Sequence, residues 1–425
     1  MLRDPVAGDA RRMAESTAPW GDYDRADPFP VFADLSDQGP VHPVVLRDGH
    51  EAWVVVRYEE ARAALNESRL SKDMQVALAA GPDIVDEGLP GPAFARHMLS
   101  ADPPDHTRLR QLVAGRFAHD AVAALGPRIE AIVDELLEEI AALGPEAEVD
   151  LMEAFAFPMP FTVICELLGI PEEHRALLGT SLGLLLRPLT TPAELEEARH
   201  ASVDLAAVFA AVLVAKESQP GDDLISDLVR EEAGGHLDRI ELQSTLFNLI
   251  VAGHETTTNV LGNAVLALFR DEYLRARVVD DLDRLPQVIE ELLRHDGPAH
   301  HATFRFATQP VEFGGVTIPA GAQVLVCLAA ANRDPRRFDD PDVIDPDRKG
   351  SRHLAFGHGI HHCLGAGLAR VEARVALGAL LRRFPDLRPA GDLADLRWDR
   401  GDGVVLRGLS TLPVVAGAEA TVRTG

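Results

Sequence analysis

The segment Phe356-Gly357-His358-Gly359-Ile360-His361-His362-Cys363-Leu364-Gly365 decides which fold this chain adopts. It places a single thiol, Cys363, behind a glycine-rich loop and directly before a strongly amphipathic stretch. The apolar residues of that stretch recur at helical spacing: Leu364, Leu368, Val371, Val375, Leu377, Leu380 and Leu381. A helix N-terminus presents unpaired N–H groups and a partial positive charge, so a cysteine there is favoured as thiolate, the form that binds metals. The segment therefore predicts a thiolate site at the start of a helix.

Other interpretations explain less of this segment. A lone cysteine before a helix is usually a small buried hydrophobe. His358, His361 and His362 crowd the thiol as zinc ligands would, but a structural zinc site needs four ligands, normally as two spaced pairs, and no second Cys/His pair occurs in the sequence. A dinucleotide-binding loop requires glycine where this chain has His362. What remains is a thiolate bound to haem iron, where cysteine pushes electron density toward O–O cleavage.

The residues around Cys363 together resemble the haem-binding signature of the cytochrome P-450 family. The resemblance runs from about Asp24 to Pro413, nearly the whole chain. It implies a mainly α-helical protein with small β-sheets (an α+β fold), shaped as a triangular prism with haem between a long central helix and the helix after the cysteine loop. It also implies heme b (iron protoporphyrin IX) as cofactor, with Cys363 as axial thiolate and with contacts from Phe356, Gly357, His361 and Gly365.

The order of the expected elements fits one domain over residues 24–415, between a polar leader at 1–23 and a tail at 416–425. Strands are expected near residues 40–57, 303–328 and 403–414, the last as a strand pair. Helical spacing dominates from Asp105 to about Arg294, and one proline-free helix is predicted from Asp238 to Arg270. The chain therefore combines a helix-rich part with a smaller β-rich part drawn from both ends of the sequence.

The composition argues against several classes of function. With 425 residues, 46% hydrophobic and 25% charged, the chain has the make-up of an ordinary globular protein. Its formal net charge of −26 argues against binding nucleic acid or an anionic membrane. No signal peptide and no run of ~18 uncharged apolar residues is visible, and three cysteines make no disulfide framework. These features predict a cytoplasmic protein, and we expect a monomer.

The middle of the predicted long helix contains Ala252-Gly253-His254-Glu255-Thr256-Thr257-Thr258 among apolar neighbours. Glycine costs roughly 1 kcal/mol in a helix interior, and a threonine run adds to that cost. A helix with one polar face is the plainer explanation, and a zinc-protease motif is excluded because it needs histidine at position 258. The segment resembles the oxygen-activation motif of the same family. This implies that Ala252 and Gly253 lie against the haem, and that Glu255 and Thr256 deliver protons to bound dioxygen.

Glu291 and Arg294 lie three residues apart and so share one helical face. A surface pair at this spacing is common and contributes little stability. At this distance before the cysteine loop, the pair resembles the family's Glu-x-x-Arg pair, which supports the structure beneath the haem. The family often supplies a further arginine near residues 341–344, where this chain has valine and isoleucine. The candidates to replace it are Arg333, Arg337 and Arg348.

Haem carries two propionates, and buried carboxylates need cationic or hydrogen-bonding partners. His106 and Arg110 lie four residues apart on one predicted helical face. They resemble the family's propionate contacts, as do Arg305, on the strand after the Glu-x-x-Arg helix, and His361. A solvated charge is the plainer explanation for each residue alone, but four matches in the family's order imply a propionate site.

The resemblance implies a haem-thiolate monooxygenase that uses dioxygen to hydroxylate or epoxidise a bulky hydrophobic small molecule. A macrolide or other polyketide is the expected substrate, with a steroid as the alternative. Because the sequence has no flavin fingerprint, electrons are expected from a ferredoxin and an NAD(P)H-dependent ferredoxin reductase, docked on a basic patch of Arg108, Arg116, Arg370 and Arg374. The pocket is expected to be lined by Met74, Val85, Leu89, Phe94, Leu185, Leu249, Ala252, Ala299, His300 and Thr303.

Two rival functions are weaker. A non-catalytic haem sensor would not need Glu255 and Thr256, and it usually carries an output module, which is not visible in this sequence. A thiolate isomerase or peroxide-driven enzyme is disfavoured by the same two residues.

Overall fold

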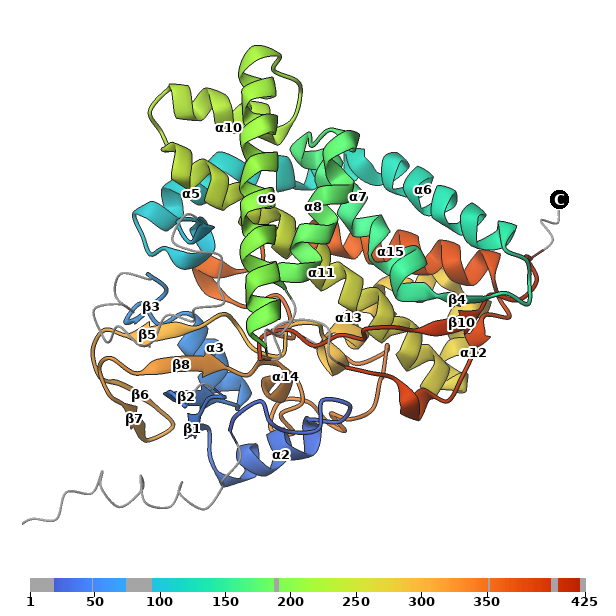
Figure 1. The fold of residues 1–425 in the computed structure, drawn as a ribbon. Coiled ribbons are helices and arrows are strands. Elements are labelled where there is room, and N and C mark those ends of the chain that lie inside the picture. Colours follow the sequence, from blue (N-terminus) through green and yellow to red (C-terminus); the bar gives the residue numbers. More distant parts are fainter. Residues whose placement is uncertain are drawn as a thin grey trace, which may run out of the picture.

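The structure is a computed structural model that describes residues 19–47, 49–73, 94–186, 191–350, 352–398 and 404–420. Helices make up most of it, and most of the strands gather at one corner of the molecule (Figure 1). This arrangement confirms the predicted mainly α-helical fold with small β-sheets.

The predicted helices form where apolar spacing placed them. The helix-rich part contains α5 (Asp105–Ala114), η5 (Gly115–Phe117), α6 (His119–Ala142), α7 (Pro158–Leu168), α8 (Glu172–Leu185), α9 (Pro192–Ser218), α10 (Leu224–Ala233), α11 (Arg239–Arg270), α12 (Glu272–Asp280), η7 (Leu282–Arg284), α13 (Leu285–Asp296) and α15 (Ala366–Arg383). The remaining helical elements are α2 (Phe29–Gln38), α3 (Tyr58–Leu65), η4 (Met98–Ser100), the π-helical η6 (Met152–Ala156), α14 (Leu328–Ala331), η8 (Gly359–His361) and η9 (Leu393–Asp395). The sequence did not predict α2 and α12, which bury only two residues each and so leave little periodicity to detect.

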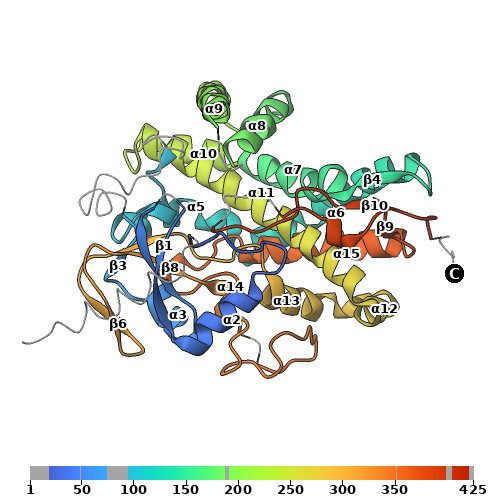
Figure 2. The ribbon, with the colours of Figure 1, turned by 60° about the horizontal axis from the view of Figure 1, so that its bottom comes forward.

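Helix α11 crosses the centre of the molecule (Figures 1 and 2), and the expectation of one uninterrupted long helix is confirmed. A capping box fixes its start, because the Asp238 carboxylate accepts from the Glu241 N–H at 2.8 Å and the Glu241 carboxylate accepts from the Asp238 N–H at 3.0 Å. Its 32 residues span ~48 Å at 1.5 Å per residue. The helix is therefore long enough to contact α7, α10, α13 and α15 in turn.

The main sheet joins the two ends of the chain. Its strand order is β1 (Val41–Val45), β2 (Glu51–Val55), β8 (Gln323–Val326), β5 (Arg305–Ala307) and β3 (Leu70–Ser71). Strands β2 and β8 are parallel, and every other neighbouring pair is antiparallel. Two smaller sheets consist of β6 (Val311–Phe313) with β7 (Val316–Ile318), and of β4 (Glu148–Asp150), β10 (Pro413–Val415) and β9 (Arg388–Pro389).

The strand pair expected near residues 403–414 is wrong for the described residues 404–414. Only Pro413–Val415 forms a strand there, and it pairs with β4 and β9. The preceding residues follow the segment after α13 as an isolated bridge between Ala299 and Leu406. The Arg407 guanidinium ties this segment to the end of α13, because it donates to the two oxygens of the Asp296 carboxylate at 2.7 and 2.6 Å.

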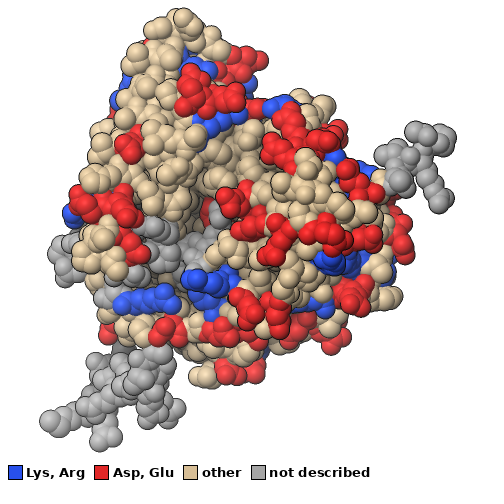
Figure 3. Space-filling view, turned by 45° about the vertical axis from the view of Figure 1, so that its right-hand side comes forward, with Lys and Arg blue, Asp and Glu red and all other residues tan. Residues whose placement is uncertain are grey.

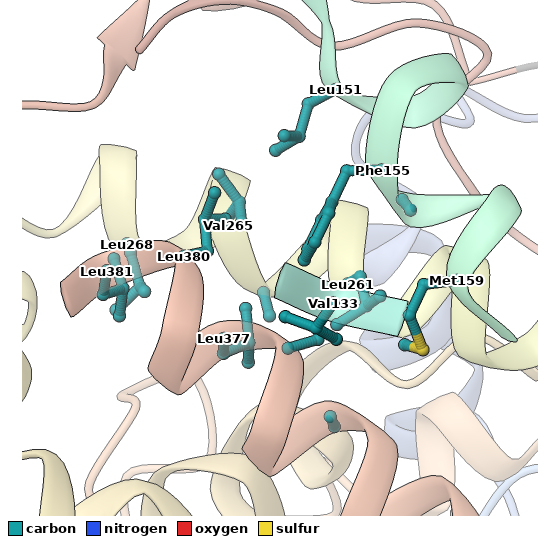
Figure 4. Packing of buried hydrophobic residues seen from close by; sticks show 14 of the residues in the cluster. Val133, Leu151, Phe155, Met159, Leu261, Val265, Leu268, Leu377, Leu380 and Leu381 are labelled. Carbon is teal, nitrogen blue, oxygen red and sulfur yellow. The ribbon is translucent and has the colours of Figure 1, made fainter. Parts of the chain in front are cut away.

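Two large apolar clusters hold the helices together. Figure 4 shows part of the first, in which α11, α15, α6 and the turn before α7 meet through residues such as Leu261, Leu377, Val133 and Phe155. The second lies among α7, α8, α9, α10 and α11. Burying a side chain of this size contributes about 1.5–3 kcal/mol, so these clusters fix the position of α11 relative to α15.

Acidic side chains are spread over the face of the molecule shown in Figure 3, as the net charge of −26 requires. One described helix, α9, is long and apolar enough to cross a membrane by length and composition, and 39% of its apolar window is buried inside the protein.

Candidate active site

The cysteine loop is shaped by two glycines. Gly357 and Gly359 have φ angles of +70° and +75°, which favour glycine over any other residue. A Cβ on Gly359 would also lie 3.0 Å from the Leu65 carbonyl oxygen. The Cys363 N–H donates to the Phe356 carbonyl at 2.9 Å, so the loop folds back on itself and presents the thiol just before α15.

The thiol of Cys363 is accessible to solvent, although protein surrounds it on most sides. This combination is expected for a side chain that lines an internal cavity. Burial raises the pKa of this thiol, while the Gly365 N–H, Arg110 and Arg370 act to lower it. Desolvation thus opposes the thiolate and the helix N-terminus favours it, and a metal ion at the sulfur would stabilise the thiolate further.

The centre of α11 has one open face. Ala252 is exposed and Thr256 is half-buried, whereas His254 and Glu255 are 1% and 3% exposed. The open residues lie four apart and so share a helical face, and the Thr256 hydroxyl donates to the Ala252 carbonyl at 3.0 Å. An open patch in the middle of a largely buried helix is a surface that a bound group could cover.

Glu255 lies beside this open face rather than on it. The Asn259 side-chain amide donates to its carboxylate at 3.4 Å, and His254 Nε2 lies 3.7 Å from the other carboxylate oxygen. Glu255 is therefore held within the helix layer, one residue from the hydroxyl of Thr256.

Gly253 permits a close approach between two helices. A Cβ at this position would lie 2.9 Å from the Ile164 side chain of α7. The packing of α11 on α7 is thus one reason for glycine here, and the expected approach to haem stays a prediction.

A cluster of basic side chains lies beside the cysteine loop. The rings of His106, on α5, and His361, in the cysteine loop, lie 4.4 Å apart. Arg305 on β5 is 4% exposed, and its Nε has no partner. Arg110 donates to the His362 carbonyl at 2.8 Å. The four residues expected to bind propionates thus come from three separate parts of the chain and face one region.

These basic groups lack the anions that burial demands. Burial and the neighbouring cations Lys72 and Arg305 lower the pKa of His361 to about 2. His106 has no hydrogen-bond partner of good geometry on either ring nitrogen, with only the Ile360 backbone nearby. Buried cations without counter-ions are costly, so this cluster fits a group with carboxylates, as haem has.

The sequence interpretation missed two members of this cluster, Lys72 and His97. Burial lowers the pKa of His97 to about 4, and Lys72 contributes to that shift. The only sequence signal for Lys72 was the scarcity of its residue type, because the chain contains only three lysines.

The Glu-x-x-Arg pair forms as expected, and the structure identifies its third member. Arg294 donates to the Glu291 carboxylate at 2.7 and 2.8 Å, and Arg348 Nε donates to it at 2.9 Å. Both arginines also donate to the Val343 carbonyl at 3.0 Å. Arg333 instead pairs with Asp342, and Arg337 donates to Gly350. Arg348 therefore replaces the arginine that the family often has near Val343.

The expected pocket residues divide into three groups. Phe94, Leu185 and Leu249 belong to one apolar cluster. Ala299 is partly buried against a second cluster, and the Thr303 hydroxyl accepts from Lys72. Met74, Val85 and Leu89 lie outside the described residues.

His300 was expected to line the substrate pocket, but its side chain packs against the N-terminal segment instead. Its ring lies 5.8 Å from the rings of both Phe29 and Phe32, and its Nε2 lies 3.3 Å from the Asp296 carboxylate. The side chain turns away because Asp296 and the N-terminal aromatic residues offer it a buried polar partner and apolar packing.

The expected basic patch is largely neutralised. Arg108 is ion-paired with Glu241, Arg116 with Asp227, and Arg370 with Glu290. No ion pair is found for Arg374 within the described part of the chain. Three of the four arginines are therefore paired with carboxylates of the same chain. These ion pairs remove most of the net positive charge that the proposed docking patch would need.

Comparison with known proteins agrees with this site. A model of the Cytochrome P-450 family matches residues 197–395. The chain is 43% identical to the cytochrome P-450 monooxygenase PikC of Streptomyces venezuelae, over 94% of each chain, and 43% identical to Cytochrome P-450 107B1 of Saccharopolyspora erythraea, over 89% of this chain and 93% of the relative. The solved structure of the tirandamycin C-bound monooxygenase TamI superposes with a TM-score of 0.83 at 41% identity, covering 92% of this chain and 98% of that one.

The enclosed thiol, the open face of α11 and these relatives define a haem-thiolate monooxygenase. The chain belongs to the cytochrome P-450 family. Its cofactor is haem with the Cys363 thiolate as axial ligand, its substrates are small molecules, and its electrons come from redox partners. When bound, the haem supplies the centre at which dioxygen is reduced.

Proposed function

We propose that this chain hydroxylates or epoxidises a macrolide or other bulky polyketide. Ferredoxin and an NAD(P)H-dependent ferredoxin reductase would supply its electrons in the cytoplasm, where the chain would act as a monomer. Relatives support the substrate class: the chain is 39% identical to mycinamicin IV hydroxylase/epoxidase and 35% identical to the polyketide biosynthesis cytochrome P-450 PksS.

The observation that carries the proposed reaction is the open face of α11, where Ala252 and Thr256 are accessible within an otherwise buried helix. A reaction that consumes protons needs a hydroxyl or carboxyl group at the reacting centre. Thr256 provides the hydroxyl, and the adjacent Glu255 provides a buried carboxylate.

Each residue would have a separate task. The Thr256 hydroxyl holds its proton against the Ala252 carbonyl and can turn that proton toward the open face. Glu255, oriented by Asn259, would replace the proton that Thr256 gives up. The aliphatic and aromatic residues of the pocket, Phe94, Leu185 and Leu249, would bind an apolar substrate and exclude water.

The proton-delivery role is tested by Thr256→Ala. Product formation should fall on the order of 100-fold relative to dioxygen consumed, because reduced oxygen would escape as peroxide. Thr258→Ala is the matched control, since Thr258 is buried and donates only along the helix to the His254 carbonyl at 2.9 Å. Equal coupling in both variants would refute the assignment.

The substrate class is tested by optical titration with a panel of macrolides, linear polyketides and steroids, followed by mass spectrometry of the products. A steroid is the specific alternative, because the chain is also 40% identical to a vitamin D(3) 25-hydroxylase. We expect tight binding and single oxygen insertion with macrolides. Turnover of steroids alone would overturn the proposed substrate and leave the reaction type intact.

A further inference from the structure

Lys72 is unusual among the charged residues that the structure describes. The chain contains three lysines. Lys216 pairs with Asp223, Lys349 is exposed, and Lys72 is only 5% exposed. Lysine is almost never buried unless a counter-charge accompanies it, so the surroundings of Lys72 should contain one.

The β-sheet places a second cation beside it instead. Strands β3 and β5 are antiparallel, with Leu70 opposite Ala307 and Ser71 opposite Phe306. Lys72 directly follows Ser71, and Arg305 directly precedes Phe306, so the two residues adjoin the last pair of this ladder. Arg305 is 4% exposed and its charge acts on Lys72. Like charges on neighbouring strands repel each other, and here both lie out of water.

The negative charge of the Asp102 carboxylate favours the charged forms of both Lys72 and Arg305. One of its oxygens accepts from the Lys72 backbone N–H at 3.1 Å and the other accepts from a serine hydroxyl. The Lys72 ammonium itself donates to the neutral Thr303 hydroxyl. Burial and the neighbouring Arg305 lower the pKa of Lys72 well below its usual value. Among the described residues, Asp102 is therefore a single carboxylate beside the three basic side chains Lys72, Arg305 and Arg110.

Asp102 connects these two charges to the cysteine loop. Its backbone carbonyl accepts from the His106 N–H at 2.9 Å, and the His106 ring lies 4.4 Å from the ring of His361 in that loop. Haem brings two carboxylates to that loop, and a charge-assisted hydrogen bond is the strongest kind that an ammonium forms with a carboxylate.

We propose that Lys72 binds a haem propionate jointly with Arg305, and that the propionates supply the negative charge that these two buried basic side chains need. The inference rests on the family's cofactor and not on the proposed substrate. It adds a fifth contact to the four that the sequence implied, and this residue directly follows β3.

The first experiment compares Lys72→Met with Lys349→Met, which removes an exposed lysine. Haem transfer to an excess of a haem-free acceptor protein should be roughly 10- to 100-fold faster for Lys72→Met, and unchanged for Lys349→Met. The haem-free Lys72→Met protein should unfold at a higher urea concentration than the haem-free parent, because an unpaired buried charge has been removed. A lysine with a merely structural role would lower stability in both states, and that result would overturn the proposal.

The second experiment varies the cofactor. Iron protoporphyrin dimethyl ester lacks the propionate charges, so the parent should bind it far more weakly than iron protoporphyrin. In Lys72→Met that difference should shrink at least several-fold, and in Lys349→Met it should not change. An equal difference in all three proteins would show that Lys72 does not meet a propionate. Neither measurement involves substrate, so either outcome leaves the proposed reaction to be judged by its own test.

Discussion

Glu372 allows a direct test of whether burial keeps a carboxylic acid protonated in the folded protein. It lies on α15, is 1% exposed, and accepts from the Thr257 hydroxyl of α11 at 3.1 Å. Its other carboxylate oxygen has no hydrogen-bond partner among the described residues. Burial raises the pKa of Glu372 from 4.5 to about 8. At neutral pH the folded protein therefore holds a proton there that the unfolded chain has lost.

The direction of the effect follows from proton linkage. Below pH 4.5 both states bind the proton, and above about pH 8 neither does. Between these values the folded state binds more protons, so stability falls as pH rises, by about 1.4 kcal/mol per unit and at most about 5 kcal/mol in total. Glu372→Gln keeps the shape and the bond to Thr257, and its amide does not titrate. The variant should match the parent near pH 4.5 and exceed it by several kcal/mol at pH 8.

Urea unfolding of both proteins from pH 4.5 to 9, followed by circular dichroism, measures this difference. Glu130→Gln is the matched control, because Glu130 is exposed on α6. If the parent and Glu372→Gln lose stability with pH at the same rate, the carboxyl is not protonated in the fold and the reasoning fails.

Two further predictions concern packing and charge. Arg294→Met should cost about 3–5 kcal/mol, because it leaves the 2% exposed Glu291 carboxylate with fewer partners; an unchanged urea midpoint would contradict this. Gly253→Val should cost about 1–3 kcal/mol by pressing on Ile164, as measured by the same unfolding. Gly126→Ala, with open space around its α-carbon, should instead raise stability by up to about 1 kcal/mol. Equal effects at the two glycines would show that contact with α7 is unimportant.

The parts of the site that the sequence predicted depend on residues close together in the chain. The cysteine loop needs positive φ angles at Gly357 and Gly359, and only glycine accepts them readily, so the pattern is visible in ten residues. Glu291 and Arg294 are likewise one helical turn apart.

The parts that the sequence did not predict depend on neighbours distant in the chain. Arg348 reaches Glu291 across 57 residues, and Gly253 packs against a side chain of α7. His300 faces aromatic residues of the N-terminal segment. Lys72 comes close to Arg305 only because β3 pairs with β5, and these strands are more than 200 residues apart in the chain. None of these contacts has a local pattern, because tertiary packing creates each of them.

The parallel pairing of β2 with β8 has a consequence for biosynthesis. The N-terminal hairpin leaves the ribosome first, yet its sheet partner is made only after all the helices from α5 to α13. Until then one hairpin edge stays open, as a strand edge that other chains could join. The cysteine loop emerges later still, so the newborn protein should acquire its iron porphyrin only when translation is nearly complete.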